Sequence, residues 1–189
     1  MRGNDGIREK KTQIARGAAS FFAALLLAFE FFAPVKAEVS QPAPVTVAIT
    51  EFSFRDTSDE PKDQKQIHEA RRHHFMAALA ADLEKSGRYR VIALTCGTEP
   101  CAATPVAAAE LLTDARKAGA DLLMIGGIQK MSTLVLWMKT GLFDVQHDQS
   151  VFDRLFTFRG DNDEAWAQAE GFIVRQLNEL KLSELRSAK

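Results

Sequence analysis

The longest apolar stretch outside the N-terminal region, residues 121–139 (DLLMIGGIQKMSTLVLWMK), constrains the fold more than any other part of the chain. Residues 121–128 are almost continuously apolar, which is typical of a strand buried on both faces of a parallel or mixed sheet. A polar break at residues 129–132 is followed by a segment rich in β-branched and aromatic side chains. We therefore expect two strands that meet at this break, with the rest of the chain packed around them.

The first 37 residues have the pattern of a secretory signal peptide. A basic leader over residues 8–16 precedes an apolar segment at residues 17–29, and Val35 and Ala37 are small residues at the −3 and −1 positions of a cleavage site. The alternative is a retained membrane anchor, but Glu30 interrupts the apolar run, and a charge inside a bilayer is costly. The pattern predicts cleavage after Ala37 and a soluble periplasmic product without stable membrane insertion.

The remaining chain is expected to form a linker over residues 38–44 and a single domain over residues 45–186. After cleavage it keeps 18 of the 24 Lys and Arg residues and 22 of the 25 Asp and Glu residues, so its net charge is −4. A mildly acidic balance argues against nucleic acid as a partner, because non-specific binding to phosphate needs a basic surface.

Two cysteines, Cys96 and Cys101, enclose a short Gly- and Pro-containing loop, CGTEPC. In an exported chain such a pair is most simply a structural disulfide. A redox pair normally has two residues between its cysteines, and a zinc site needs more ligands nearby.

The order of predicted elements is β-α-β-α-β-β-β-α. Helices between the first three strands imply parallel pairing, and the short links that follow imply antiparallel hairpins. The fold class is therefore α/β, with a mixed sheet of about five strands and helices packed on it. The segment after the first strand, residues 54–64, is polar and is predicted to be a loop. The ranges are: strands 45–52, 88–94, 121–128, 133–139 and 151–158; helices 64–86, 104–118 and 161–186; polar turn region 141–150, with room for a short strand at 142–145.

Helical spacing also predicts which residues of the helices are buried. Phe75, Leu79 and Leu83 fall on one stripe of the first helix, which Gly87 is expected to end. Trp166 and Phe172 are expected near the buried side of the last helix.

Three stretches, GRYRVIAL, ARKAGADLLMIGGIQKMSTLVLWMK and VFDRLFTFRGDNDEAW, resemble a bacterial family of predicted secreted proteins of unknown function. More distantly, the pattern of the first two-thirds of the domain is similar to the N-terminal domain of the translocation protein TolB. It is also similar to the periplasmic domains of the curli secretion protein and of the lipoprotein activators of penicillin-binding proteins. This resemblance implies a mixed α/β sandwich that works through protein–protein contacts in the cell envelope. The chain departs from these relatives in lacking a lipid-anchoring cysteine and a β-propeller.

Four polar residues are expected at one edge of the sheet. Asp56 and Lys130 follow strands, and His68 and Arg72 lie on the sheet side of the first helix, near its start. These residues could form a small cleft for an anionic group. The interpretation we favour is that they are structural, with Arg72 paired to a loop carboxylate such as Asp56 and His68 a satisfied residue at the boundary of the core.

The remaining polar motifs are interpreted as structural. His73 and His74 point about 100° apart on a helix, so they cannot share a metal, and we expect no metal or cofactor. Gly126 and Gly127 lie inside an apolar run without the context of a phosphate loop, so a bulge or close packing of a helix on the sheet is expected. Asp161 and Glu164 fit a capping box at the start of the last helix.

Val135 and Trp137 share one face of the fourth strand with Thr133 and Lys139. We expect this strand to be covered on both faces; the alternative is an exposed Val135/Trp137 face that binds a partner. No catalytic constellation is recognised. The first hypothesis is a non-enzymatic accessory or adaptor domain that contacts an envelope protein through residues 129–139, including Ser132 and Trp137, or through a sheet edge. The second is a small-ligand-binding protein that uses the edge of Asp56, His68, Arg72 and Lys130.

Overall fold

The structure, a computed structural model, describes residues 43–96, 99–101 and 108–182. The predicted signal peptide and nearly all of the linker lie outside these residues, as do Thr104 and Pro105 at the predicted start of the second helix. The described elements are β1 (Val45–Ile49), β2 (Ser53–Asp56), α1 (Lys65–Lys85), β3 (Tyr89–Ala93), β4 (Thr95–Cys96), β5 (Glu99–Pro100), α2 (Ala108–Lys117), β6 (Leu122–Lys130), β7 (Val135–Asp144), β8 (Gln149–Arg159) and α3 (Asp163–Asn178).

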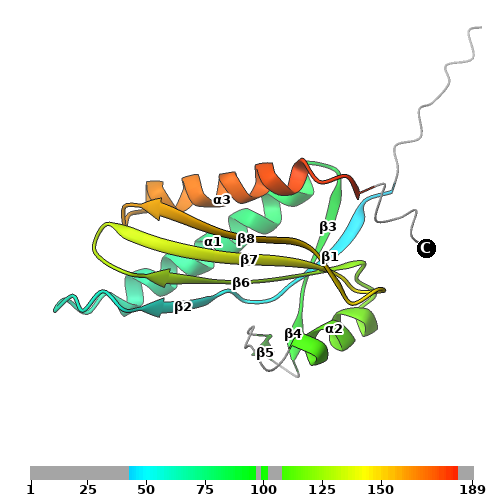
Figure 1. The fold of residues 1–189 in the computed structure, drawn as a ribbon, viewed down its shortest axis with the longest axis horizontal. Coiled ribbons are helices and arrows are strands. Elements are labelled where there is room, and N and C mark those ends of the chain that lie inside the picture. Colours follow the sequence, from blue (N-terminus) through cyan, green and yellow to red (C-terminus); the bar gives the residue numbers. More distant parts are fainter. Residues whose placement is uncertain (1–42, 97–98, 102–107, 183–189) are drawn as a thin grey trace, which may run out of the picture. The chain divides into compact units, whose positions relative to one another are not determined.

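The main sheet is mixed and has six strands in the order β3-β1-β6-β7-β8, with β2 also paired to β6 (Figure 1). β1 pairs in parallel with β3 and β6, and β6, β7 and β8 form antiparallel hairpins. The predicted α/β class, the parallel-then-antiparallel pattern and the central position of β6 are therefore confirmed. The side chains of β6 are largely covered on both faces of the sheet, and this burial agrees with the continuous apolar sequence that predicted a central strand.

Two separate strands pair with the same edge of β6. β1 pairs with its first part, from Leu122 to Met124, and β2 pairs with its second part, from Gly127 to Lys130. Between them the ring of Phe52 packs so close to Gly126 that an added Cβ would lie 2.4 Å from ring carbons. The ring of Phe52 therefore leaves no room for a side chain at residue 126. This contact, and not the predicted bulge or close packing of a helix, accounts for the glycine. The prediction of a loop from residue 54 onward was wrong over β2, whose sequence SFRD has little apolar content but adds backbone pairs to β6.

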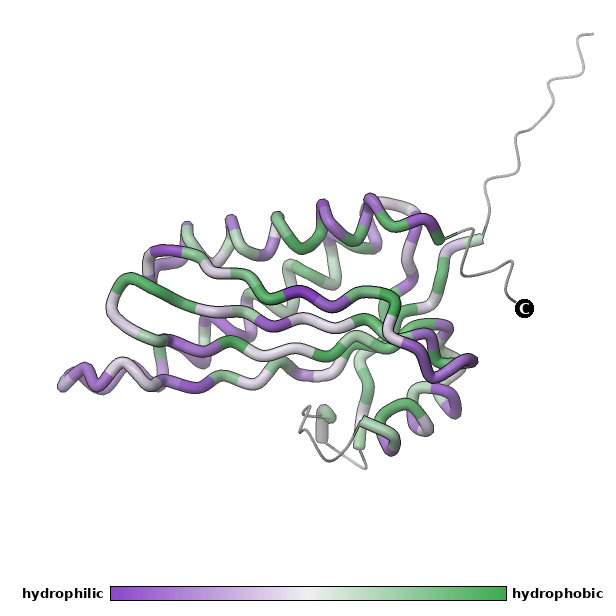
Figure 2. The backbone as a smooth tube through the Cα atoms, viewed as in Figure 1, coloured by the Kyte–Doolittle hydropathy of each residue, from purple (hydrophilic) through white to green (hydrophobic). Residues whose placement is uncertain are grey.

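The main core lies between the sheet and the helices α1 and α3, which pack against each other. In α1 the stripe of Phe75, Leu79 and Leu83 is buried as predicted, and Gly87 has a φ of +70°, which suits the residue that ends the helix. Figure 2 shows hydrophilic and hydrophobic residues alternating along α3, as expected for a helix with one face on a sheet. Phe172 of α3 was predicted to be buried but is 39% exposed.

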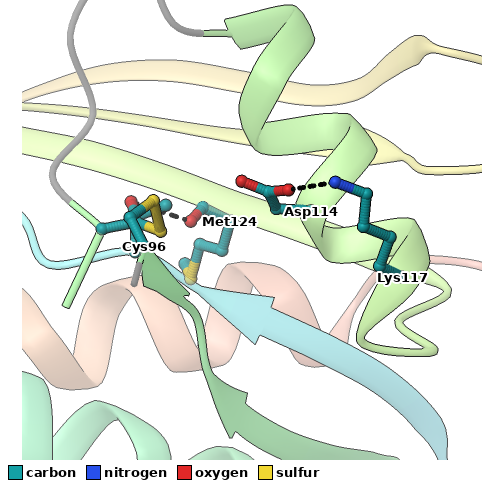
Figure 3. The surroundings of a disulfide bond; sticks show 6 residues. Cys96, Asp114, Lys117 and Met124 are labelled. Carbon is teal, nitrogen blue, oxygen red and sulfur yellow. Dashed lines mark hydrogen bonds and ion pairs between the residues drawn. A yellow bond between two sulfur atoms is a disulfide. The ribbon is translucent and has the colours of Figure 1, made fainter. Parts of the chain in front are cut away.

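The opposite face of the sheet carries a smaller core around α2, which includes Leu111, Ala115 and Leu123. The predicted disulfide Cys96–Cys101 is present, with an S–S distance of 1.96 Å, and Cys101 is buried in this smaller core. Figure 3 shows the disulfide beside Met124 of β6, with α2 nearby. α2 is only ten residues long, so it covers one end of this face.

Two predicted boundaries differ from the structure. β7 continues through Gly141 to Asp144, so the polar turn predicted from residue 141 is shortened to the four residues between β7 and β8. The side chain of Asn162, not that of Asp161, caps α3 by accepting a hydrogen bond from the Ala165 backbone N–H at 2.8 Å. Among the described residues, no helix is both long and apolar enough to cross a membrane.

Candidate functional site

A buried lysine lies at the edge of the sheet where α1 and α3 begin. Lys130, the last residue of β6, is fully buried. Its Nζ lies 2.8 Å from Asp161 Oδ2, 2.9 Å from Glu60 Oε2 and 3.9 Å from Asp56 Oδ2. We refer to Lys130, Asp161, Glu60, Asp56 and His68 as the lysine cluster.

His68 joins the lysine cluster from the first turn of α1. Its Nε2 lies 2.7 Å from Asp161 Oδ2, and its ring packs against the ring of Phe54 at a tilt of 34°, with 4.6 Å between ring centroids. Arg71 reaches the second oxygen of the same carboxylate, with its Nη1 2.8 Å from Asp161 Oδ1. The carboxylate of Asp161 therefore receives contacts from Lys130 at the end of β6 and from His68 and Arg71 in the first turns of α1, all distant from Asp161 in the sequence.

The electrostatics of the cluster favour the charged forms of its central pair. Burial opposes ionisation of Asp161, but hydrogen bonds from Lys130 and His68 outweigh it and hold the pKa of Asp161 below its usual value. Burial would likewise lower the pKa of Lys130, but hydrogen bonds to Asp161 and Glu60 raise it above its usual value. Because the positive charge is matched by carboxylates on several sides, little of it remains for a ligand.

Arg72 does not join the lysine cluster, contrary to the predicted convergence of four residues. Its guanidinium pairs with Glu51 and Glu69 and donates a hydrogen bond to the Phe52 backbone oxygen at 3.3 Å. The sequence suggested a carboxylate partner for Arg72, with Asp56 as the example; Asp56 instead lies near Lys130 and accepts hydrogen bonds from Ser58.

A cavity of about 650 Å³ lies at this edge, and Arg72 lines it together with Asp56 and other members of the lysine cluster. Its lining includes Arg72, His68 and Glu60, and contains more carboxylates than cationic side chains. Among the described residues no group of His, Cys, Asp and Glu side chains has the arrangement of a metal site. The carboxylates of Asp161 and Glu60, which could otherwise bind a cation, are instead paired with the ammonium group of Lys130.

The sequence identified three members of the cluster and missed two. Asp161 was assigned to helix capping because it precedes α3, and Glu60 lies in the hydrophilic loop after β2 (Figure 2) without any motif. Asp161 and Glu60 can be identified as members of the cluster only once Lys130 is known to be buried. The burial of Lys130 depends on the tertiary structure and not on the local sequence.

The second candidate region is the sheet face opposite α1 and α3. Trp137 projects from β7 on this face and is 39% exposed, and its cross-strand neighbours are Gln129 and Thr157. Leu155, opposite Lys139 in the register, is 58% exposed. We refer to the surface of Val135, Trp137 and Leu155 as the open face.

The prediction that both faces of β7 are covered was wrong. α2 covers only the end of this face near β1 and β3, and no other described helix lies on it (Figure 1). The β6–β7 turn adds further apolar surface beside the open face, since Leu134 is 66% exposed and Met131 is 36% exposed. Ser132, the remaining candidate, lies in this turn, and its Oγ accepts a hydrogen bond from the Leu134 N–H at 3.3 Å.

A third feature, which sequence reasoning missed, is a groove of about 410 Å³ between α1 and α3. It is lined by Phe75, Trp166 and Glu170, among others, and Glu170 is 5% exposed. Burial, together with the nearby carboxylate of Asp82, raises the pKa of Glu170 to about 7, while Arg175 acts in the opposite direction. The helical spacing placed Trp166 in the core but gave no sign that a carboxylate lies beside it.

Comparison of the sequence with known families gives one match over most of the folded domain. The model of the family DUF3280, described as "Protein of unknown function (DUF2380)", matches residues 45–177. No curated protein sequence matches the chain significantly.

Solved structures with a similar arrangement include three bacterial proteins. TolB from Acinetobacter baumannii is 19% identical with a TM-score of 0.42, and the alignment covers 72% of this chain but only 29% of TolB. The lipoprotein GNA1162 from Neisseria meningitidis is 14% identical with a TM-score of 0.47, covering 73% of this chain and 99% of that protein. The C-terminal domain of LpoB from Salmonella enterica is 12% identical with a TM-score of 0.42, covering 63% and 85%.

Proposed function

The chain belongs to the family DUF3280, and we propose that its folded domain is a non-enzymatic accessory or adaptor domain of the periplasm. It binds another protein of the cell envelope through the open face of its sheet. The observation that carries this proposal is the 39% exposure of Trp137 on an inner strand of the sheet.

The position of Trp137 is unusual for a residue without a partner. An antiparallel sheet with one solvated face normally carries polar side chains there. Here a tryptophan lies beside Leu155, which is 58% exposed, and beside the apolar β6–β7 turn. Large aromatic side chains at the centre of such a patch contribute most of the binding energy in protein interfaces.

The lysine cluster supports a structural rather than a catalytic role for the polar residues at the start of α1. A general acid, base or nucleophile must be accessible to a substrate. Lys130 is 0% exposed and His68 is 2% exposed, and both are held by Asp161. The same contacts weigh against the binding of an anionic small ligand by the predicted residues, because Lys130 and Arg72 already have carboxylate partners.

A periplasmic location is part of the proposal. The predicted signal peptide motivates it, and the disulfide Cys96–Cys101 supports it, because structural disulfides persist in oxidising compartments. A domain of this kind needs no cofactor to act.

Capture of envelope proteins by the purified domain tests the proposal. Trp137→Ala removes the centre of the open face and is expected to abolish capture of the specific partner. Ile67→Ala is the matched control, because Ile67 is similarly exposed, at 43%, but lies on α1. Equal capture by the Trp137→Ala variant and the unmodified domain would contradict the proposed surface.

A further inference from the structure

β8 forms one edge of the main sheet and is its longest strand. It spans eleven residues, Gln149–Arg159, and pairs with β7 on one side only. No described residue pairs with its outer edge. Along such an edge every second residue directs its N–H and C=O groups outward, where they can pair with an added strand.

A groove runs beside this edge, between β8 and α3. It has a volume of about 250 Å³, and its lining includes Phe156 and Phe158 from β8 and Ala169 and Phe172 from α3. The rings of Phe156 and Phe172 are nearly perpendicular, with 5.1 Å between their centroids. Phe172 remains 39% exposed, although the next residue of α3, Ile173, is fully buried. The groove therefore offers a partly open aromatic wall next to unpaired backbone groups.

Three arginines surround the groove and the edge. Arg159 lines the groove, Arg175 lies with its guanidinium carbon 5.8 Å from the ring centroid of Phe172, and Arg154 lies 5.5 Å from that of Phe152. Within the part of the chain that the structure describes, none of the three forms an ion pair with a carboxylate. This region therefore has an excess of positive charge, although the mature chain as a whole is acidic.

We propose that the outer edge of β8 and the β8–α3 groove bind an extended acidic peptide segment of another protein. The segment adds a strand to β8, places an apolar side chain against Phe156 and Phe172, and directs carboxylates at the arginines. In this mode of recognition backbone pairing provides affinity and the pocket for alternate side chains provides specificity. The site lies along the outer edge of β8 and toward α3, and it borders the open face at Thr157 and Arg159, the cross-strand neighbours of Trp137 and Val135. The proposal stands even if the open face binds nothing.

Charge distinguishes this occupant from two others. A second copy of the chain pairing edge to edge would bring Arg154 and Arg159 of both copies together, and like charges at an interface are unfavourable. The C-terminal segment of the chain itself, residues 183–189 (SELRSAK), carries two basic residues and one acidic residue, so its charge does not complement the site. An acidic segment from a different protein matches the arginines.

Peptide binding, measured by fluorescence anisotropy with the exported chain (residues 38–189), tests the proposal. The probe is a labelled octapeptide, Glu-Val-Glu-Phe-Glu-Val-Glu-Val, whose alternation suits a strand with one aromatic anchor. Replacing its glutamates with lysines, or methylating alternate backbone nitrogens, is expected to weaken binding at least about tenfold, because charge complementarity or backbone pairing is lost. Failure of the acidic probe to bind, or equal binding of all three peptides, would overturn the proposal.

Paired variants locate the site on the protein. Phe172→Ala is expected to weaken binding about tenfold, while Ile67→Ala, with 43% exposure on α1, leaves it unchanged. Arg159→Glu is expected to weaken binding to a similar degree, whereas Arg55→Glu changes it little, since Arg55 is an exposed residue of β2. Circular dichroism verifies that each variant is folded.

Three further outcomes would also overturn the proposal. Equal losses in the test and control variants would mean that the peptide binds elsewhere or non-specifically. A dimer seen by analytical ultracentrifugation and dissociated by Phe172→Ala would identify a second copy of the chain as the occupant. Loss of peptide binding in Trp137→Ala, with Phe172→Ala unaffected, would move the site to the open face.

Discussion

The two faces of β7 are equally rich in apolar residues but differ in what covers them. Leu136 and Met138 face α1 and α3 and are at most 1% exposed, whereas Val135 and Trp137 face the other way and remain partly exposed. On the helix-covered face even the charged residue Lys130 is fully buried. The charged and titratable residues around Lys130, which would be the first candidates for catalysis, therefore stabilise the fold. The surface that remains for recognition is apolar.

The largest effect is expected from removing the charge at the centre of the lysine cluster. Lys130→Ala leaves the carboxylates of Asp161 and Glu60 buried without their ammonium partner, so the free energy of unfolding should fall by about 3–5 kcal/mol. Urea denaturation at neutral pH measures it. Lys139→Ala is the control: Lys139 pairs with Asp153 on the exposed surface, and its loss should cost less than about 1 kcal/mol. A similar loss of stability in both variants would contradict the conclusion that charged residues stabilise the fold only on the helix-covered face.

The next largest effect is expected from an apolar residue on the helix-covered face of β7. Leu136→Ala creates a cavity in the main core and is expected to lower the free energy of unfolding by about 3 kcal/mol. The measurement is again urea denaturation, with the slope of the transition compared to detect any change in compactness. A loss below about 1 kcal/mol would show that the helix-covered face is less tightly packed than the structure indicates.

Local sequence patterns predicted the elements whose environment depends on their own residues. The continuous apolar run of β6 identified the central strand, the spacing of Cys96 and Cys101 identified the disulfide, and Gly87 marked the end of α1. These features follow from periodicity, burial or backbone conformation, all of which are encoded within a few residues.

The features that were missed depend on residues distant in the sequence. β2 is a strand because β6 extends beyond the end of β1 and leaves backbone groups to pair. Asp161 has the sequence position of a helix cap, but Lys130 and His68 bind its carboxylate, and Asn162 caps the helix instead. The exposure of Trp137 follows from the short reach of α2, which no property of β7 could indicate.

A smaller, pH-dependent effect is expected from Glu170. Its pKa is about 7 in the folded chain and 4.5 without burial, so between these values the folded state holds a proton that the unfolded state has released. Stability therefore falls as pH rises from about 4.5 to 7, by at most about 3 kcal/mol, and changes no further from this group above pH 7.

Glu170→Gln should remove this slope and make the protein more stable than the unmodified chain at pH 8, by about 1–3 kcal/mol. Thermal unfolding across pH 4.5–8 measures the difference. Asp82 on α1 and Arg175 on α3 act on the same carboxylate, so both are left unchanged in the variant. Glu164→Gln, at an exposed position of α3, is the control and should keep the slope. An identical slope in Glu170→Gln would assign the pH dependence to other groups.

The smallest effect on stability is expected at the open face. Trp137→Ala removes a larger side chain than Leu136→Ala does, yet it should lower the free energy of unfolding by about 1 kcal/mol or less, because no described element packs over this residue. Urea denaturation at two protein concentrations measures this value. A loss as large as that of Leu136→Ala, or one that grows with protein concentration, would mean that the open face is covered in solution by another copy of the chain. A small, concentration-independent loss combined with abolished capture of a partner would assign Trp137 to recognition, because a residue that contributes little to the fold would then be required for binding.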